Sequence, residues 1–515
     1  MPLFGGSKPD HPMADIKQAK TIIADLPPND AIKALDEITF WLDSISRADG
    51  FKVDYSYELY GLLDRVGKVH QRKLSQEYLT TDRQEKFREN KLWTASFDFW
   101  KTLGNAYSQC LEQFQAGARG ARAVKKLIPA ISCRVLRALS LQLKWVMLRY
   151  GPIADRVWGD LGQVFFFAEN RGIAGEEVEV YPGLHGQSSV QQEFLKALML
   201  GISSTDGLTP VRQEIAERLV AHFGKMYIMQ KRPAAGCNYC FDLAMRKPAM
   251  RALKRVEVTP TMRYFGAGNA LPALRQVMEK TKADGCLPAD INLGGAYDTD
   301  IVLSVMRHLA MYWSEDPPAR HSERRKTATR LTVIHGFQDM LKWLDPVQDA
   351  ESLDFNVQNA GTESWIVENV SDGGYGAIIP QVKGDWIKIG SLLGVQAERS
   401  RFWGAGIVRR ITRDEYQQRR VGIQVFSTAI IPVRVAPAGE VSSINVTRDS
   451  EAAVLLSTSP DKKGEIAMLL TPGTYVASQT LEMIVRGKSY ILIPSRLNES
   501  GEDFDWASFK IMQRQ

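Results

Sequence analysis

The chain has 515 residues, of which 44% are hydrophobic and 24% are charged, and its formal net charge is +6. This composition is ordinary for a soluble globular protein of about three domains and excludes general disorder. A net charge this small for the length argues against a broad electrostatic surface for DNA or anionic lipid, so any anion must bind at a local cluster of basic residues.

The five cysteines are an odd number and lie far apart, except for the pair Cys237-Asn-Tyr-Cys240. A disulfide framework is therefore not expected, and the pair lacks the second Cys or His pair that would complete a zinc site. Residues 1–13 read as a flexible tail rather than a signal peptide, because no basic start is followed by an apolar run. We predict a cytoplasmic protein without a metal.

From residue 14 to residue 313 apolar side chains recur mostly at helical spacing, which predicts an all-α domain of nine or ten helices. Residues 29–46 illustrate the pattern, with Asn29 as the expected helix cap. Their apolar positions recur at steps of three and four residues: Ile32, Leu35, Ile38 and Leu42. No fixed-period repeat is visible in this region.

Two segments of the helical region differ from the rest. Residues 127–151 are the most apolar stretch, but they carry four basic residues, namely Arg134, Arg137, Lys144 and Arg149. Since each charge is costly at the centre of a bilayer, this stretch predicts a long soluble helix and no membrane insertion. Residues 226–267 lose the helical period and predict short strands or loops.

A charged segment, residues 314–330, then interrupts the helical pattern. Pro317 and Pro318 stop a helix and favour an extended chain, so we expect a linker, called the arm below. Residues 331–435 change to a period of two, with about six short strands and one short helix at 337–346, as in a small antiparallel barrel or sandwich. Residues 436–515 contain a second series of strands and hairpin turns. The predicted fold class is a multidomain α+β chain.

Within the arm, residues 319–330 carry five cations against a single acid, Glu323. The cations are Arg320, Arg324, Arg325, Lys326 and Arg330. Guanidinium groups fork onto phosphate oxygens or onto the O6/N7 edge of guanine, and they also stack on base planes. Such a segment suits a nucleotide, although a run of charges is more often a solvated linker.

A second motif, Asn369-x-Ser371-x-x-Gly374, lies between two apolar strands. Asn and Ser side chains fold back on the backbone and Gly permits unusual backbone angles, so the motif is by itself a sound turn. Its polar groups would also form a small cup for a phosphate or a purine edge. An ordinary turn remains the alternative for this motif alone.

Together, in this order, "RHSER" with Arg325 and "NVSDGG" resemble the PilZ domain, the bacterial cyclic di-GMP receptor module. The likeness covers about residues 320–435 and includes the closing strands "WGAGIVRRI" and "RRVGIQVFS". It implies a six-stranded antiparallel β-barrel. The residues that it implies for the ligand are Arg320, Arg324, Arg325, Asn369, Ser371 and Gly374, with Arg330 and Arg409 as further candidates.

The resemblance implies a cyclic di-GMP effector rather than an enzyme. In such a module the ligand orders the arm, which would shorten the tether between the barrel and the helical domain. The helical domain would then dock differently and change its contact with an unknown protein partner. No other cofactor is implied, and exposed helical faces leave a homo-oligomer open.

The sequence leaves three alternative functions to compare. Catalysis is disfavoured because the chain has no nucleophile elbow, Walker loop, His-Glu-x-x-His or dinucleotide fingerprint. A non-enzymatic interaction scaffold, whose barrel no longer binds nucleotide, is the main alternative. Direct DNA or RNA binding ranks last because residues 314–330 contain no aromatic residue for base stacking apart from His321. The last β-domain lacks both motifs and is expected to be structural or partner-binding.

Overall fold

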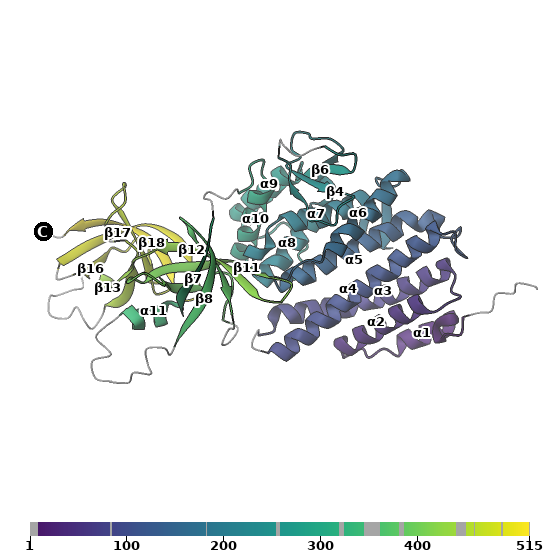
Figure 1. Cartoon of the computed structure of the whole chain (residues 1–515), viewed down its shortest axis with the longest axis horizontal. Helices are drawn as coiled ribbons and strands as arrows, with labels where there is room; N and C mark the ends of the chain where they lie inside the picture. The colour runs from purple at the N-terminus through teal and green to yellow at the C-terminus, as the bar shows by residue number, and fades with distance from the viewer. Residues whose placement is uncertain are drawn as a thin grey trace, which may run out of the picture. The chain divides into compact units, whose positions relative to one another are not determined.

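The computed structural model describes residues 9–82, 85–181, 183–253, 258–318, 324–344, 361–380, 386–438, 450–457, 459–485 and 488–513. The chain divides into two compact units, Met1–Ala319 and Arg320–Gln515. The first unit is mainly helical, and the second is built of two closed antiparallel barrels of six strands each (Figure 1). The predicted fold class is confirmed.

The described part of the first unit contains ten α-helices, within the predicted number. They are α1 (Ile16–Ala24), α2 (Ala31–Arg47), α3 (Val53–Thr80), α4 (Lys86–Gln115), α5 (Ile128–Leu148), α6 (Asp155–Asn170), α7 (Val190–Ile202), α8 (Pro210–His222), α9 (Ala270–Asp284) and α10 (Thr299–Trp313). The expected cap of α2 was wrong by one residue, because the carboxylate of Asp30, not Asn29, accepts the N–H of Lys33 at 3.0 Å.

Helix α5 is the central element of this unit. Pro129 in its first turn supplies a backbone angle that suits a helix start, and the helix is buried on nearly all sides by α4, α6, α7 and α8 (Figure 1). The long helix predicted for residues 127–151 is therefore confirmed. In the part of the chain that the structure describes, no helix combines the length and the apolar character needed to traverse a bilayer.

Helices α3 and α4 approach each other closely at Gly67. A Cβ at this glycine would lie 2.5 Å from the ring of Phe99, so only a residue without a side chain fits there. Phe99 is fully buried and belongs to the single large core that α1 to α10 share. Long antiparallel helices with one apolar face each thus account for most of the unit.

Two small sheets complete the first unit. Strands β1 (Val178–Tyr181) and β2 (Leu184–Ser188) form an antiparallel hairpin before α7. A four-stranded sheet has the order β3 (Ile228–Gln230), β6 (Met262–Gly266), β4 (Tyr239–Asp242), β5 (Met250–Arg251). Residues 226–267 therefore hold short strands, as predicted. Cys237 and Cys240 are buried beside this sheet, and the described residues contain no group of three or more ligating side chains that could hold a metal.

The first barrel has the strand order β10-β11-β12-β9-β8-β7. Its strands are β7 (Arg325–His335), β8 (Thr362–Ser371), β9 (Gly374–Ile379), β10 (Leu392–Ala397), β11 (Gly404–Arg413) and β12 (Arg419–Ser427). Residues 325–330, which we placed in the arm, form the first half of β7. Their side chains are mostly exposed, so backbone pairing with β8 rather than burial keeps this polar segment extended.

The second barrel has the order β13-β14-β15-β18-β17-β16. Its strands are β13 (Ile431–Pro437), β14 (Glu451–Leu455), β15 (Glu465–Leu470), β16 (Leu481–Val485), β17 (Lys488–Ser500) and β18 (Asp505–Gln513). Since β13 already pairs with β14 and β16, the barrels divide between β12 and β13, slightly before residue 435.

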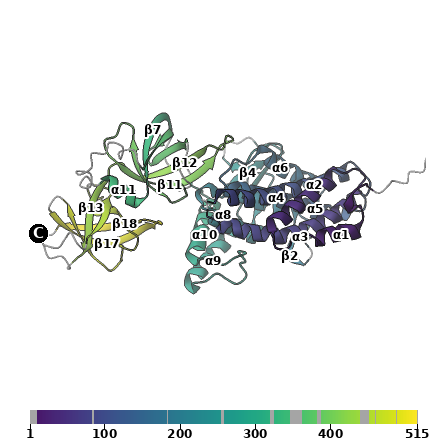
Figure 2. The same ribbon diagram turned by 90° about the horizontal axis from the view of Figure 1, so that it is seen from below.

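The two barrels share a hydrophobic core of their own. The short helix α11 (Phe337–Leu344), which the sequence predicted, contacts β7 and β10 of the first barrel and β13 and β14 of the second (Figure 2). The buried residues of this shared core are Phe337, Met340, Leu392, Ala405, Ile407, Ile430, Val454, Leu456, Leu469 and Phe504. The second barrel is therefore packed onto the first.

We predict that Phe504→Ala destabilises both barrels. Phe504 is fully buried in the shared core, and the substitution should cost about 3 to 5 kcal/mol of folding free energy. Hydrogen exchange measured by mass spectrometry should show faster exchange in β10 and β11 as well as in β14 and β15. Phe509→Ala, in the second barrel's own core, is the control and should loosen mainly β13 to β18. Faster exchange confined to the second barrel in both variants would contradict the shared core.

Candidate functional site

The pairing of β7 with β8 brings the arm and the Asn-x-Ser motif together. In this antiparallel pair Arg325 lies opposite Val370, and Lys326 lies opposite Asn369. Neighbouring strands are about 4.8 Å apart, so Arg325 and Lys326 run beside the motif despite the long stretch of sequence between them. The structure thus joins the two segments that the sequence marked.

The same register continues across the barrel as one row of residues. Asn369 on β8 lies opposite Gly376 on β9, Gly376 opposite Gly422 on β12, and Gly422 opposite Arg410 on β11. With Lys326, the row has polar side chains at both ends and two glycines in the middle. Asn369 and Arg410 are three strand spacings apart, roughly 14 Å.

The row faces away from the barrel core. Gly422 alternates with the buried residues Val421 and Ile423, so its position points outward. A Cβ at Gly422 would lie 3.3 Å from the Cβ of Arg410, which places Arg410 on the same outer face. We call Gly376 and Gly422 the glycine floor, because neither contributes a side chain to this face.

Asn369 depends on the glycine floor for its position. A Cβ at Gly376 would lie 2.5 Å from Oδ1 and 2.7 Å from Nδ2 of Asn369, so the amide group occupies the space above the glycine. Its Oδ1 is buried and has no hydrogen-bond partner among the described residues. A buried acceptor without a donor is costly, so a donor on a bound ligand would be stabilising at this point.

Ser371 and Gly374 lie at the turn that follows. The hydroxyl of Ser371 donates a hydrogen bond to the carbonyl of Gly374 at 3.4 Å. A Cβ at Gly374 would lie 1.9 Å from the carbonyl oxygen of Ile423, so the close packing of β9 on β12 requires this glycine. The packing of the strands therefore explains the glycine at position 374 without any ligand.

The arginines of the arm differ in position. Arg324 and Arg325 are exposed at the start of β7, next to the motif. Arg330 lies farther along β7, opposite Ile366, and its backbone N–H donates to Glu398 at 3.3 Å. Arg320 lies outside the described residues. The structure therefore brings Arg324 and Arg325, but not Arg330, to the motif.

Arg409 makes a contact that the sequence did not predict. Its Nη1 and Nη2 donate to the two carboxylate oxygens of Glu499 on β17, at 2.6 and 2.5 Å, and its Nε donates to Oε1 of Gln424 at 2.7 Å. Arg409 thus links the two barrels. No motif marks Glu499, because the pairing depends on how the barrels pack.

Sequence reasoning also missed the glycine floor. The available signal was the presence of Gly376 and Gly422 inside strands, where glycine weakens the strand and marks close approach by another group. Next to Asn369, the carboxylate of Glu368 lies 3.6 Å from Arg420, so a basic side chain offsets the acid nearest the motif.

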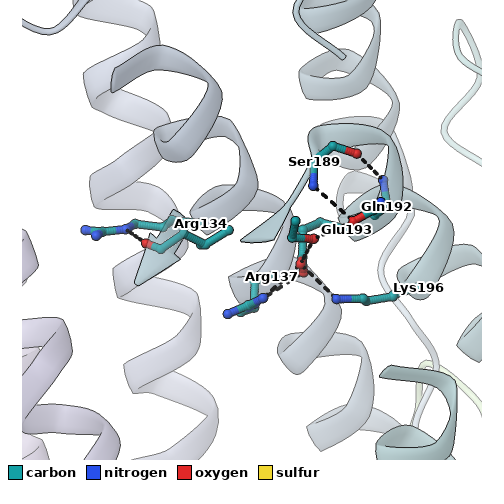
Figure 3. Close-up of polar contacts among 8 residues, drawn as sticks. Arg134, Arg137, Ser189, Gln192, Glu193 and Lys196 are labelled. Carbon is teal, nitrogen blue, oxygen red and sulfur yellow. Dashed lines mark hydrogen bonds and ion pairs between the residues drawn. The ribbon is translucent and has the colours of Figure 1, made fainter. Parts of the chain in front are cut away.

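A second polar cluster is buried in the helical unit, between α5, α7 and the β1–β2 hairpin (Figure 3). Arg137 donates to both carboxylate oxygens of Glu193, at 3.2 and 2.8 Å, and Lys196 donates to the same carboxylate at 2.9 Å. Arg134 donates from Nε to the carbonyl of Val180 at 3.1 Å. Figure 3 also shows the capping box of α7, formed by Ser189 and Gln192. The cluster fixes the hairpin to the helices.

The ring of Tyr181 in this hairpin is surrounded by cations. Lys68, Arg134 and Arg137 all lie against it. Burial and the charges of Arg137 and Arg134 lower the pKa of Lys68 to about 7, although the carboxylate of Asp64 acts in the opposite direction. These contacts are internal to the fold, so we interpret the cluster as structural.

The segment of the chain that contains this cluster is similar to a known protein family. Residues 17–232 match the family model of the N-terminal domain of the cyclic-di-GMP receptor FimW. The match covers less than half of the chain and ends before both barrels. No curated protein matches the sequence. The helical unit is therefore similar to a receptor domain, and the match leaves the barrels uncovered.

We predict that Lys68 makes stability depend on pH. Its pKa is lower in the folded chain than in the unfolded chain, so the unfolded state binds more protons above pH 7 and the free energy of unfolding should rise with pH. Between pH 7 and 8.5 the slope due to Lys68 should approach about 1 kcal/mol per pH unit. Urea unfolding of Lys68→Met should lack this contribution, whereas the exposed control Lys225→Met should keep the slope of the parent. Equal slopes in all three proteins would refute the prediction.

Proposed function

We propose that the chain is a cyclic di-GMP-binding effector and that the ligand binds on the outer face of the first barrel. The observation that carries the proposal is the register of β7 and β8, which sets Arg325 and Lys326 opposite Val370 and Asn369. The match of residues 17–232 to a cyclic-di-GMP receptor domain supports it from a different part of the chain. The PilZ-like character of the barrel is part of this proposal.

The chemistry of the face suits two guanylates joined in a ring. Arginine forks onto phosphate or guanine, and Arg324 and Arg325 are exposed at the start of β7, beside the motif. Asn369 offers an acceptor without a partner among the described residues, which an N–H of a guanine would satisfy. The amide of Asn369 covers Gly376, whereas a Cβ at Gly422 would meet only the Cβ of Arg410, so the flat face of a base would lie over Gly422.

The remaining residues follow from the same proposal. Arg320 completes the Arg-x-x-x-Arg pattern with Arg324 and would reach the ligand from the arm, and Ser371 and Gly374 form the turn beside it. Binding would restrict the arm, which joins the helical unit to the barrel, and so change how a protein partner of the helical unit is engaged. The protein would act in the cytoplasm and without catalysis.

The direct test is calorimetric titration of the full chain with cyclic di-GMP. We expect micromolar or tighter binding, and we expect Arg325→Ala to weaken it by about ten-fold or more, because a bidentate arginine contact contributes on the order of 1 to 3 kcal/mol. Arg434→Ala, which removes an exposed arginine of the second barrel, is the control and should bind like the parent. Absence of heat with the parent would favour the scaffold alternative.

A second test uses Gly376 in β9 and Gly373 in the turn before it. Gly376→Ala should displace the amide of Asn369 and weaken cyclic di-GMP binding several-fold, with little change in thermal stability, because the amide is a side-chain end that can move. Gly373→Ala is the matched control, since a Cβ there meets nothing within 4 Å. Equal affinities of the two variants would show that the position of Asn369 does not matter for the ligand.

A further inference from the structure

Arg409 lies within reach of the proposed ligand face. Its Nε donates to Gln424, and Gln424 on β12 is the direct strand partner of Gly374 on β9. The backbone of Val425 also bonds to the carbonyl of Gly373 at 3.0 Å. Strand β11 is two strand spacings from β9, roughly 10 Å, so a ligand the size of a dinucleotide that sits at the motif can extend to Arg409.

The partner of Arg409 belongs to the other barrel. Glu499 on β17 takes both Nη atoms of Arg409, so the fork that would grip a phosphate is occupied by a carboxylate. The contact lies next to an aromatic one, in which Phe426 of β12 and Trp506 of β18 have ring centroids 4.3 Å apart. Trp506 is also the strand partner of Glu499. The second barrel thus touches the first beside the proposed site.

We propose that Glu499 competes with the ligand for Arg409, so that the second barrel sets the affinity of the site and senses its occupation. The proposal rests on the proposed function. A carboxylate and a phosphate present the same pair of oxygens to a guanidinium group, and Arg409 can hold only one of them in this way. A ligand phosphate that takes Arg409 releases Glu499.

The exposure of the pair makes this exchange feasible. The side chains of Arg409 and Glu499 are 37% and 29% exposed, so water screens their attraction and the pair is weak compared with a buried one. The shared core around α11 is independent of the pair and keeps the barrels joined. Occupation of the site would therefore change the polar contact at this edge without separating the barrels.

The test is titration of the full chain with cyclic di-GMP after Glu499→Gln, which preserves shape and removes the charge. We expect binding about two- to five-fold tighter than the parent, the range that corresponds to a partly exposed ion pair. Glu502→Gln is the matched control, because Glu502 pairs with Lys388 of the first barrel and lies in the same barrel as Glu499. It should leave the affinity unchanged.

The double variant Arg409→Ala/Glu499→Gln should lose the gain, because the cation that the ligand recruits is then absent. Thermal unfolding of each variant checks that the barrels remain folded. Parent binding with an unchanged or weaker Glu499→Gln variant would overturn this inference and leave the proposed function standing. Failure of both the parent and Glu499→Gln to bind would overturn both, whereas binding by the variant alone would support competition by Glu499.

Discussion

The pairing of β7 with β8 is the interaction on which the barrel unit and its candidate site depend. It closes the first barrel, and it holds the polar residues 325–330 extended although few of their side chains are buried. Backbone hydrogen bonds between β7 and β8 therefore stabilise this half of the strand, whereas buried side chains also stabilise the other strands of the barrel. Buried residues such as Leu331 and Val333 set the register farther along β7, and an irregularity between Lys326 and Thr329 shifts it, so the position of Arg325 beside the motif depends on both.

The sequence predicted the elements whose side chains have a regular pattern of burial. The helices, including the long α5 and the short α11, and the change to β-structure after residue 330 follow from apolar periodicity. Prediction from the sequence failed where the burial of side chains follows no regular pattern. The first half of β7 resembles a linker in sequence, because its exposed side chains show no alternation of apolar and polar residues. The boundary between the barrels at β13 depends on the pairing of β13 with β14 and β16, which the local sequence does not indicate.

The residues of the candidate site also fall into two groups, those that the sequence could predict and those that it could not. Asn369, Ser371 and the arginines of the arm could be predicted, because guanidinium groups and a polar turn are recognised from residue type and order alone. The same reasoning could not separate Arg325, beside the motif, from Arg409, bound to Glu499. Both are arginines of β-strands in the first barrel, and the packing of the second barrel distinguishes Arg409. The glycine floor also needs the register, since its two members come from strands that are not adjacent in the sequence.

Two separate parts of the chain support the proposal that cyclic di-GMP is the ligand. The helical unit matches a receptor domain over residues 17–232, and the buried cluster around Arg137 and Glu193 that fixes its hairpin lies inside the matched segment. The first barrel carries basic side chains, the hydrogen-bond acceptor of Asn369 and the glycine floor. A receptor needs both a surface that binds the ligand and a unit whose state depends on it. Since the arm is the covalent connection between the units and ends in β7 beside Asn369, a ligand that orders the arm would act on both at once.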